Sequence, residues 1–142
     1  MFRTILVAVD GSDSARAAFR KAVEEAKVWQ ADLKMIYVIE TGLFTSIPLD
    51  NTLEVLYNLL EREGQEMIEE CDSIATEEGV QHSGFIRQGH AGSEILDLAD
   101  EQNADLIIVG SHGKSDVDRL LLGSVSEHVI RHSTITTMVV RT

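Results

Sequence analysis

A glycine-rich segment near the end of the chain has the residue types and spacing to bind a phosphate group. The segment Gly110-Ser-His-Gly113 is followed by nine residues and then by Gly123-Ser124. The apolar run at 104–109 predicts a buried strand before it, and residues 125–132 predict a helix after it. Glycines let backbone N–H groups approach an anion, and a helix start adds unpaired donors and partial positive charge. A long loop with turn glycines is the alternative, and the flanking strand and helix favour phosphate binding.

The elements that would position this segment are five strands alternating with four helices. Hydrophobic patterning predicts strands at Thr4–Val9, Leu33–Ile39, His82–Gln88, Leu106–Val109 and Thr136–Arg141, and helices at Ala15–Trp29, Thr52–Glu78, Glu94–Gln102 (capped by Ser93) and after Ser124. Regular alternation implies an α/β fold: a five-stranded parallel sheet with right-handed crossovers and helices on both faces. The length of 142 residues fits one domain, residues 1–142.

In such sheets ligands bind beyond the carboxyl ends of the strands, where the strand order reverses. We expect the first and fourth strands to flank that point, which places Asp10 and Gly110 at one crevice. Asp10 is also a common turn former between a strand and a helix. Its place in the predicted crevice favours a ligand role.

The charge and composition exclude several classes of protein. The net charge is −12, and residues 50–78 hold ten acidic residues but one basic residue, Arg62. This argues against a general nucleic-acid binder, which needs a basic face. No apolar run approaches a membrane span, no signal peptide is apparent, and the single Cys71 fits a reducing cytoplasm. An acidic surface also suits a salty cytoplasm, where self-repulsion is screened.

At these residues the chain resembles the universal stress protein family, of the ATP-binding, UspA-like type with a Rossmann-like, adenine nucleotide alpha hydrolase-like fold. Three segments carry the resemblance: residues 5–12, residues 104–113 and Leu120-Leu-Leu-Gly-Ser-Val125. The spacing Gly-x2-Gly-x9-Gly-Ser matches the pattern of members that bind ATP. The resemblance covers nearly the whole chain, without a departure at the glycines.

The resemblance implies a role for each matching position. Asp10 would hydrogen-bond the ribose, the main chain of Val38 would meet the adenine, and Gly110 would pack against the ribose. Gly113, Gly123, Ser124 and Val125 would hold the phosphates through backbone N–H groups and the Ser124 hydroxyl. The expected ATP-binding residues are Ala8, Val9, Asp10, Val38, Val109, Gly110, His112, Gly113, Gly123, Ser124 and Val125. Mg²⁺ or Mn²⁺ would be held by the phosphates, with no ligand from protein side chains.

Several side chains have plainer interpretations beside these. His128 and His132 are four apart on a helix, a spacing that can bind metal, but a surface pair is the better prediction without a third ligand. His82 and His90 show no partner in the sequence. Trp29 is expected to close the end of the first helix. A predicted apolar stripe on the long helix comprises Leu53, Leu56, Leu60, Gly64, Met67, Cys71 and Ile74.

Two classes of function follow. The first is an ATP-binding regulatory protein, not an enzyme, in which nucleotide occupancy tunes assembly or the interaction with a partner such as a transporter. The alternative is a slow ATPase or an ATP-cleaving enzyme of the related α/β class. Residues 9–14 share only the end of that class's Ser-Gly-Gly-x-Asp-Ser loop, and the Walker pattern is absent. A third interpretation, a phosphoacceptor receiver domain, is set aside. Such a domain needs an aspartate at the end of the third strand, where this chain has Arg87 and Gln88.

An apolar strand at a sheet edge invites pairing with another chain. The last predicted strand, Thr136 to Arg141, is such an edge, and in the resembled family it pairs across a dimer. We therefore expect a homodimer through this strand, on which a higher oligomer can be built.

Overall fold

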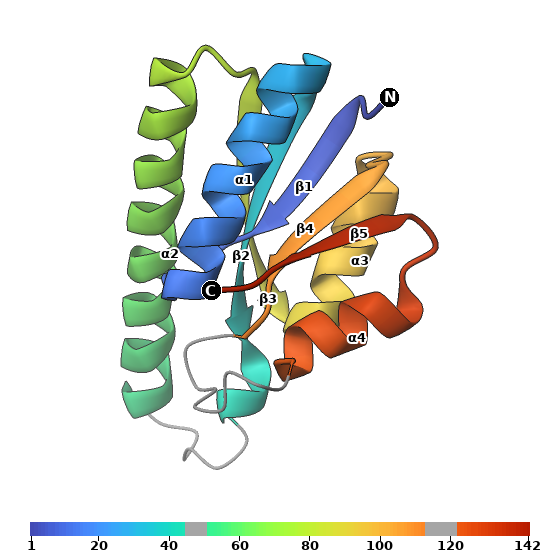
Figure 1. Ribbon diagram of the computed structural model, residues 1–142. Coiled ribbons are helices and arrows are strands. Elements are labelled where there is room, and N and C mark those ends of the chain that lie inside the picture. Colours follow the sequence, from blue (N-terminus) through green and yellow to red (C-terminus); the bar gives the residue numbers. More distant parts are fainter. Residues whose placement is uncertain (45–50, 113–121) are drawn as a thin grey trace.

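The computed structural model describes residues 1–44, 51–112 and 122–142 (Figure 1). Its elements, in chain order, are β1 (Thr4–Ala8), α1 (Asp13–Trp29), β2 (Asp32–Glu40), the short 3-10 helix η1 (Thr41–Phe44), α2 (Asn51–Glu77), β3 (His82–Gly89), α3 (Ala91–Glu101), β4 (Leu106–Gly110), α4 (Ser124–His132) and β5 (Thr136–Val140). The predicted alternation of strands and helices is confirmed. Most predicted bounds lie within two residues of the observed ones.

The strands form one parallel sheet in the order β3-β2-β1-β4-β5. β1 pairs with both β2 and β4, so the strand order reverses between β1 and β4, as predicted. The register places Val7 opposite Ile108 and Gly110 opposite Val140. The carboxyl ends of β1 and β4 therefore open onto the same edge of the sheet, which is the position a ligand takes in this class of fold.

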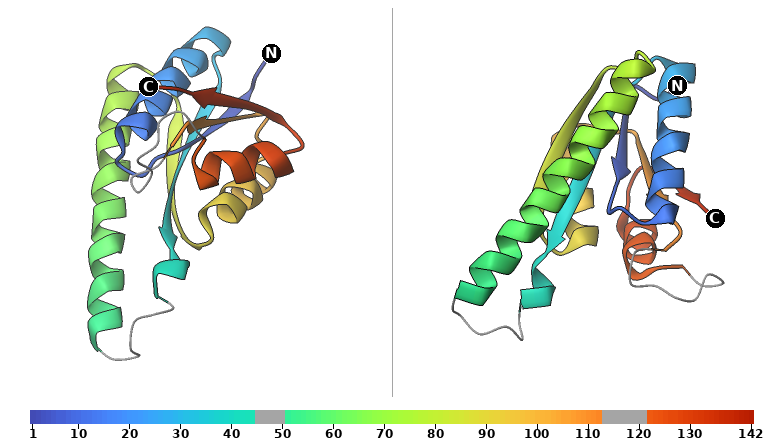
Figure 2. Two further views of the ribbon diagram at one scale, coloured as in Figure 1. Left: turned by 60° about the horizontal axis from the view of Figure 1, so that its bottom comes forward. Right: turned by 90° about the vertical axis from the view of Figure 1, so that its left-hand side faces the viewer.

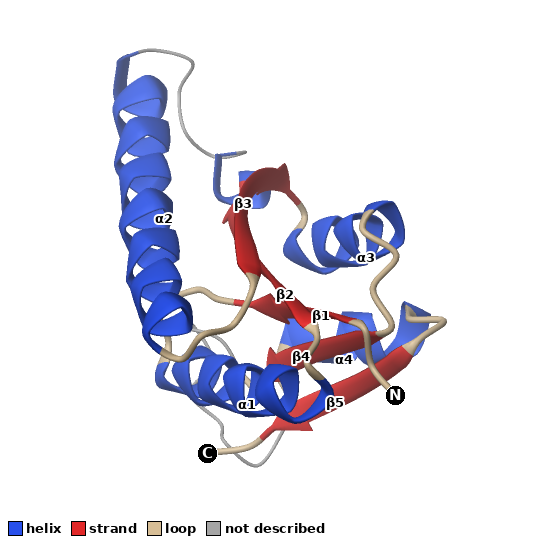
Figure 3. Ribbon diagram, turned by 90° about the horizontal axis from the view of Figure 1, so that it is seen from above, coloured by secondary structure: helices blue, strands red, loops and turns tan. Residues whose placement is uncertain are grey.

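Helices cover both faces of the sheet, and each face has its own core (Figure 3). α1 and α2 pack on one face, where alternate strand residues such as Ile5, Val7 and Met35 meet Phe19 and Cys71. α3 and α4 pack on the other face, against residues that point the opposite way, such as Leu6 and Ile107. The strands are apolar on both sides because both sides are covered. The predicted burial of Cys71 is confirmed.

α2 is the longest element, and its first turns extend with η1 beyond the carboxyl ends of the strands (Figure 2). Gly64 lies where α2 crosses Tyr37 of β2, and a Cβ there would lie 2.7 Å from the Tyr37 ring. The missing side chain thus lets the helix approach the sheet. Ile74 of the predicted stripe is 37% exposed, because the buried seam passes through Ile68, Cys71 and Ala75.

Residues close to each end of α1 determine where this helix begins and ends. Ser12 is the N-cap, and its side chain accepts a hydrogen bond from the Ala15 N–H at 3.1 Å. Gln30, in the left-handed conformation, ends the helix, and its N–H bonds the Ala26 carbonyl. Trp29 is part-exposed and meets Phe2 edge-on at 5.8 Å, and so closes this end of the helix as predicted.

α3 begins three residues before the predicted start, so Ser93 lies inside the helix and is not its cap. The observed N-cap is His90, which makes no side-chain capping bond. Instead, the Glu40 carboxylate at the end of β2 accepts the Ala91 N–H at 2.9 Å. A side chain 51 residues away in sequence therefore satisfies this helix end.

Within the described ranges, no helix combines the length and the apolar character that a membrane crossing requires.

Candidate functional site

The turn after β1 places the carboxylate of Asp10 at the edge of the sheet where strand order reverses. Asp10 Oδ1 accepts the Ser12 N–H at 2.8 Å, which holds the side chain over the start of α1. Asp10 thus forms the turn that its residue type suggests and lies at the predicted crevice as well. Its second carboxylate oxygen has no recorded partner among the described residues, and remains available to accept a hydrogen bond.

Gly110 ends β4 directly beside the first turn of α1. A Cβ at this position would lie 2.5 Å from Ser14 Oγ and 2.7 Å and 2.8 Å from the Ser14 backbone carbon and oxygen. Such distances are shorter than van der Waals contact, so glycine is required for the strand end and the helix to meet. The close approach draws the start of α1 over the carboxyl end of β4.

The amino end of α4 presents backbone donors to the same edge. Gly123 is the N-cap and supplies no side-chain capping bond, so the amides of Ser124, Val125 and Ser126 have no acceptor among the described residues. The Gly123 N–H itself is already donated to the Ser111 carbonyl at 2.6 Å. The donors open to an anion are therefore the amides within the helix's first turn, not that of Gly123.

A buried set of hydroxyls fixes β4's end relative to α4 and α1. Ser126 Oγ donates to the carbonyl oxygens of Ser111 and Gly123 at 3.1 Å and 3.0 Å. Ser111 Oγ lies 3.0 Å from His112 Nδ1 and 3.5 Å from Ser14 Oγ. Because these groups satisfy one another, the backbone around the crevice is held in place before any ligand binds.

A cleft of about 80 Å³ joins these groups. Its lining residues are Ala8, Val9, Asp10, Ala15, Ile36, Val38, Ala91, Ile95, Val109, Gly110, His112, Gly123, Val125 and Ser126. Nine of the eleven residues expected at an ATP site are among them. Ser124 is exposed and does not line the cleft, and Gly113 lies outside the described residues.

Five lining residues are additions to the predicted set: Ala15, Ile36, Ala91, Ile95 and Ser126. Ile36 lies in β2, and Ala15 in the first turn of α1. Ala91 and Ile95 come from α3, whose amino end the predicted parallel order already places at this edge. A search of every helix start after a strand would have found them, whereas the sequence motif alone points to the glycine segment.

Among the described residues that line the cleft, Asp10 supplies the one carboxylate. Tyr37, buried on the α1–α2 face, has its pKa raised to about 12, first by burial and then by the negative charges of Glu63 and Asp10.

In the described part of the chain, no group of three or more His, Cys, Asp or Glu side chains is arranged to hold a metal ion.

The structure shows that the ring of His90 packs near other histidine rings, a contact that the sequence alone does not reveal. The rings of His90 and His128 lie 5.2 Å apart, and those of His128 and His132 stack at 4.4 Å. His128 also packs on Gly92, where a Cβ would lie 2.5 Å from its ring. Burial, followed by the charges of His132 and His90, lowers the pKa of His128.

Comparison with known proteins identifies the class to which this fold and cleft belong. The sequence pattern of the Universal stress protein family matches residues 1–141. A universal stress protein of Methanocaldococcus jannaschii is 34% identical over 141 residues, covering 99% of this chain and 83% of that protein. The universal stress protein YxiE of Bacillus subtilis is 35% identical, covering 99% of this chain and all of that protein. The chain belongs to the universal stress protein family.

Solved structures agree with this assignment. The structure of UspA from Lactobacillus plantarum has a TM-score of 0.90 at 28% identity, covering 98% of this chain and 97% of that one. Among the similar structures are a universal stress protein in complex with cAMP (TM-score 0.69, 28% identity) and one from Archaeoglobus fulgidus in complex with dAMP (TM-score 0.73, 25% identity). Some members of the family therefore bind nucleotides.

Proposed function

We propose that this chain is an ATP-binding regulatory protein, and that ATP occupies the cleft at the ends of β1 and β4. The observation that supports this most directly is the amino end of α4, where the amides of Val125 and Ser126 have no acceptor among the described residues and share the lining of the cleft with Asp10. A helix amino terminus attracts phosphate, and a carboxylate accepts hydrogen bonds from ribose hydroxyls. The two groups lie on one cleft, as one nucleotide requires.

The residues present fit the parts of a nucleotide in order. Ala8, Ile36, Val38 and Ile95 offer apolar surface, on which a base can rest with its edge toward the main chain of β2. Asp10 stands at the middle of the proposed path, where the carboxylate oxygen that has no partner among the described residues would accept a hydrogen bond from a ribose hydroxyl. The amides of Ser124, Val125 and Ser126 would bind the phosphates.

A divalent cation would be carried by the phosphates themselves. ATP and this chain, with its net charge of −12, repel each other. Mg²⁺ or Mn²⁺ bound to the phosphates reduces this repulsion, and the groups offered at α4 are N–H donors that contact phosphate oxygens and not metal. The proposal therefore places no metal ligand on the protein.

Nucleotide binding would change either the assembly of the chain with its own copies or its affinity for a partner protein. β5 is an edge strand, paired with β4 on one side only, and we propose that it pairs with a second copy of the chain. The Ser111 N–H bonds the Val140 carbonyl at 2.9 Å, so the segment after β4 that borders the cleft is tied to the end of this edge strand. A ligand that prefers one arrangement of residues 110–112 would thus favour one arrangement of the edge.

Sedimentation velocity of the nucleotide-free chain, with and without Mg·ATP, tests this regulatory proposal. We expect a dimer whose stability changes on addition of ATP. Thr137→Pro removes an N–H at the open edge, because alternate residues such as Val140 face β4. This variant should be monomeric, and Thr142→Pro, beyond the strand, is its control. A wild-type monomer at all micromolar concentrations would refute the dimer.

The rate of ATP hydrolysis, measured on the same protein, distinguishes a regulatory protein from an enzyme. Steady ATP turnover above about one per second, the low end for ordinary enzymes, would favour an ATP-cleaving enzyme over a binding protein. We expect much slower hydrolysis.

A further inference from the structure

A second and larger hollow lies between α1 and α2, on the face of the sheet that the nucleotide cleft does not use. Its volume is about 370 Å³, against about 80 Å³ for the cleft. Small-molecule sites in proteins usually enclose about 300–1,000 Å³. We refer to this hollow as the α1–α2 groove. Of the described residues, Val9 and Ala15 line both this groove and the cleft.

The floor of the α1–α2 groove is apolar. Phe19 and Val23 come from α1, and Met67, Cys71 and Ile74 come from α2. Burial, with smaller contributions from Glu70 and Asp72, raises the pKa of the Cys71 thiol to about 12. The thiol is therefore neutral at physiological pH and behaves as a small apolar group. A ligand on this floor must present a hydrocarbon surface.

Ion pairs cross both ends of the groove and limit its length. Arg16 bonds Glu70 at 3.3 Å at one end, and Lys27 bonds Glu78 at 2.8 Å at the other. Arg16 and Lys27 are eleven residues apart on α1, which corresponds to about 16 Å along a helix. A partner helix would need a trough open at its ends, whereas a small molecule fits between the two pairs. The closed ends therefore favour a small molecule.

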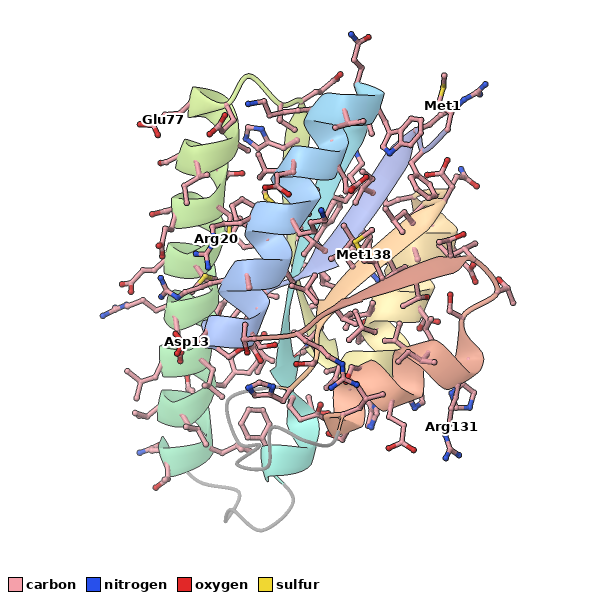
Figure 4. The ribbon with its side chains drawn as sticks, in the orientation of Figure 1. Met1, Asp13, Arg20, Glu77, Arg131 and Met138 are labelled. Atoms are coloured by element: carbon pink, nitrogen blue, oxygen red, sulfur yellow. The ribbon has the colours of Figure 1, made fainter. Side chains whose placement is uncertain are left out.

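Among the described residues, one cation on the rim of the groove has no charged partner. Glu70 and Glu78 are paired as described, and Lys21 lies 3.4 Å from Glu24. The side chain of Arg20 has no ion pair or hydrogen bond with any described residue. It lines the groove, and Figure 4 shows it on the side of α1 that faces α2. The rim thus offers a guanidinium that nothing in the described part of the chain pairs with, next to an apolar floor.

We propose that the α1–α2 groove binds a small carboxylic acid with an apolar body, such as a medium-chain fatty acid. The carboxylate pairs with the guanidinium of Arg20, and the hydrocarbon lies on Phe19, Val23 and Met67. A carboxylate matches the two parallel N–H groups of arginine, which makes this contact stronger than one to a neutral headgroup. The proposal is independent of nucleotide binding, because it uses a different face of the sheet.

Calorimetric titration of the full chain with decanoate, in moderate salt to screen the acidic surface, tests the proposal. We expect saturable binding of one decanoate per chain, and at least tenfold weaker binding of decanol. Arg20→Met keeps the apolar stem and removes the charge, and should weaken decanoate binding about tenfold. Lys21→Met, the neighbouring cation outside the groove, is the matched control and should bind as the wild type does.

Ile74→Trp fills the groove from a position that is 37% exposed, so the domain can fold around it. This variant should lose decanoate binding. Equal binding by Arg20→Met and Lys21→Met, or no saturable binding by the wild type, would overturn the proposal. So would displacement of decanoate by saturating ATP together with unchanged decanoate binding by Ile74→Trp, because decanoate would then occupy the nucleotide cleft.

Discussion

The nucleotide cleft and the α1–α2 groove are built from different parts of the chain. The cleft is formed by main-chain groups at strand and helix ends: the amides of α4, the turn at Asp10 and the bare backbone at Gly110. The groove is formed by side chains of two helices that lie next to each other on the sheet. Main-chain sites depend on where elements begin and end, and side-chain sites depend on how elements pack.

That difference explains why the sequence predicts the nucleotide cleft and does not predict the α1–α2 groove. Glycines at fixed spacing after a strand and before a helix are visible along the chain. Arg20 and Met67, by contrast, are ordinary helix residues until α1 and α2 are placed side by side. The two sites also make separable predictions, because changes at Asp10 and Ser124, which do not line the groove, should leave it unaffected.

The largest effect is expected at Gly110. Gly110→Ala places a methyl group against the Ser14 backbone and should destabilise the fold by about 1–3 kcal/mol, the usual cost of overpacking. It should also displace the start of α1 from the cleft and weaken ATP binding. Gly42→Ala is the control, since the one described neighbour of its Cβ would be Glu40 Oε1, at an ordinary 3.5 Å. Thermal denaturation compares the two, and equal melting temperatures would contradict the close approach at Gly110.

The next effect is specific to phosphate. Ser124 is the first residue of α4, where proline is well tolerated, and Gly123 before it has the extended ψ of 163° that proline requires. Ser124→Pro therefore removes one N–H without disturbing the helix. ATP affinity should fall about tenfold, while AMP affinity changes less.

Ser124→Ala removes the hydroxyl, which the family resemblance also assigns to the phosphates, and keeps the amide, so the difference between the two variants isolates the contribution of the amide. Binding of ATP by Ser124→Pro with wild-type affinity would show that the amino end of α4 does not hold the phosphates.

Asp10 should contribute equally to every adenine nucleotide, since all carry ribose. Asp10→Asn keeps an oxygen that can accept the Ser12 N–H but loses the negative charge. A hydrogen bond from the ribose to this neutral oxygen is roughly half as strong as one to a carboxylate. ATP, ADP and AMP should each bind a few-fold more weakly. Asp13→Asn, in the exposed first turn of α1, should bind all three like the wild type. A loss confined to ATP would move Asp10 from the ribose to the phosphates.

The smallest effect is a pH dependence on the α3–α4 side. Because the pKa of His128 in the fold is lowered from the ordinary value of 6.5, the unfolded chain binds more protons there. Stability should therefore be full above pH 6.5 and fall as the pH decreases below it. His128→Gln should reduce this loss between pH 7.5 and 5.5, measured by thermal denaturation. An unchanged pH dependence in His128→Gln would assign the effect to other groups.

Apolar periodicity and glycine spacing are local signals, and they predicted the point where the strand order reverses, with Asp10 and Gly110 beside it. Other lining residues, such as Val38, were expected only from the family resemblance. Sequence reasoning placed the start of α3 wrongly, because the cap is supplied by Glu40 across the sheet. It also assigned a phosphate role to the Gly123 N–H, which the Ser111 carbonyl occupies. Both details arise from contacts between segments distant in the chain, as does the meeting of His90 with His128.

The most direct test of the central proposal is calorimetric titration of the nucleotide-free protein with ATP, ADP and AMP, each with and without Mg²⁺. We predict micromolar or tighter binding of ATP, with affinity falling as phosphates are removed, since each lost phosphate gives up contacts with the α4 amides. Equal affinity for ATP and AMP, or no binding of either, would contradict a phosphate site at the amino end of α4.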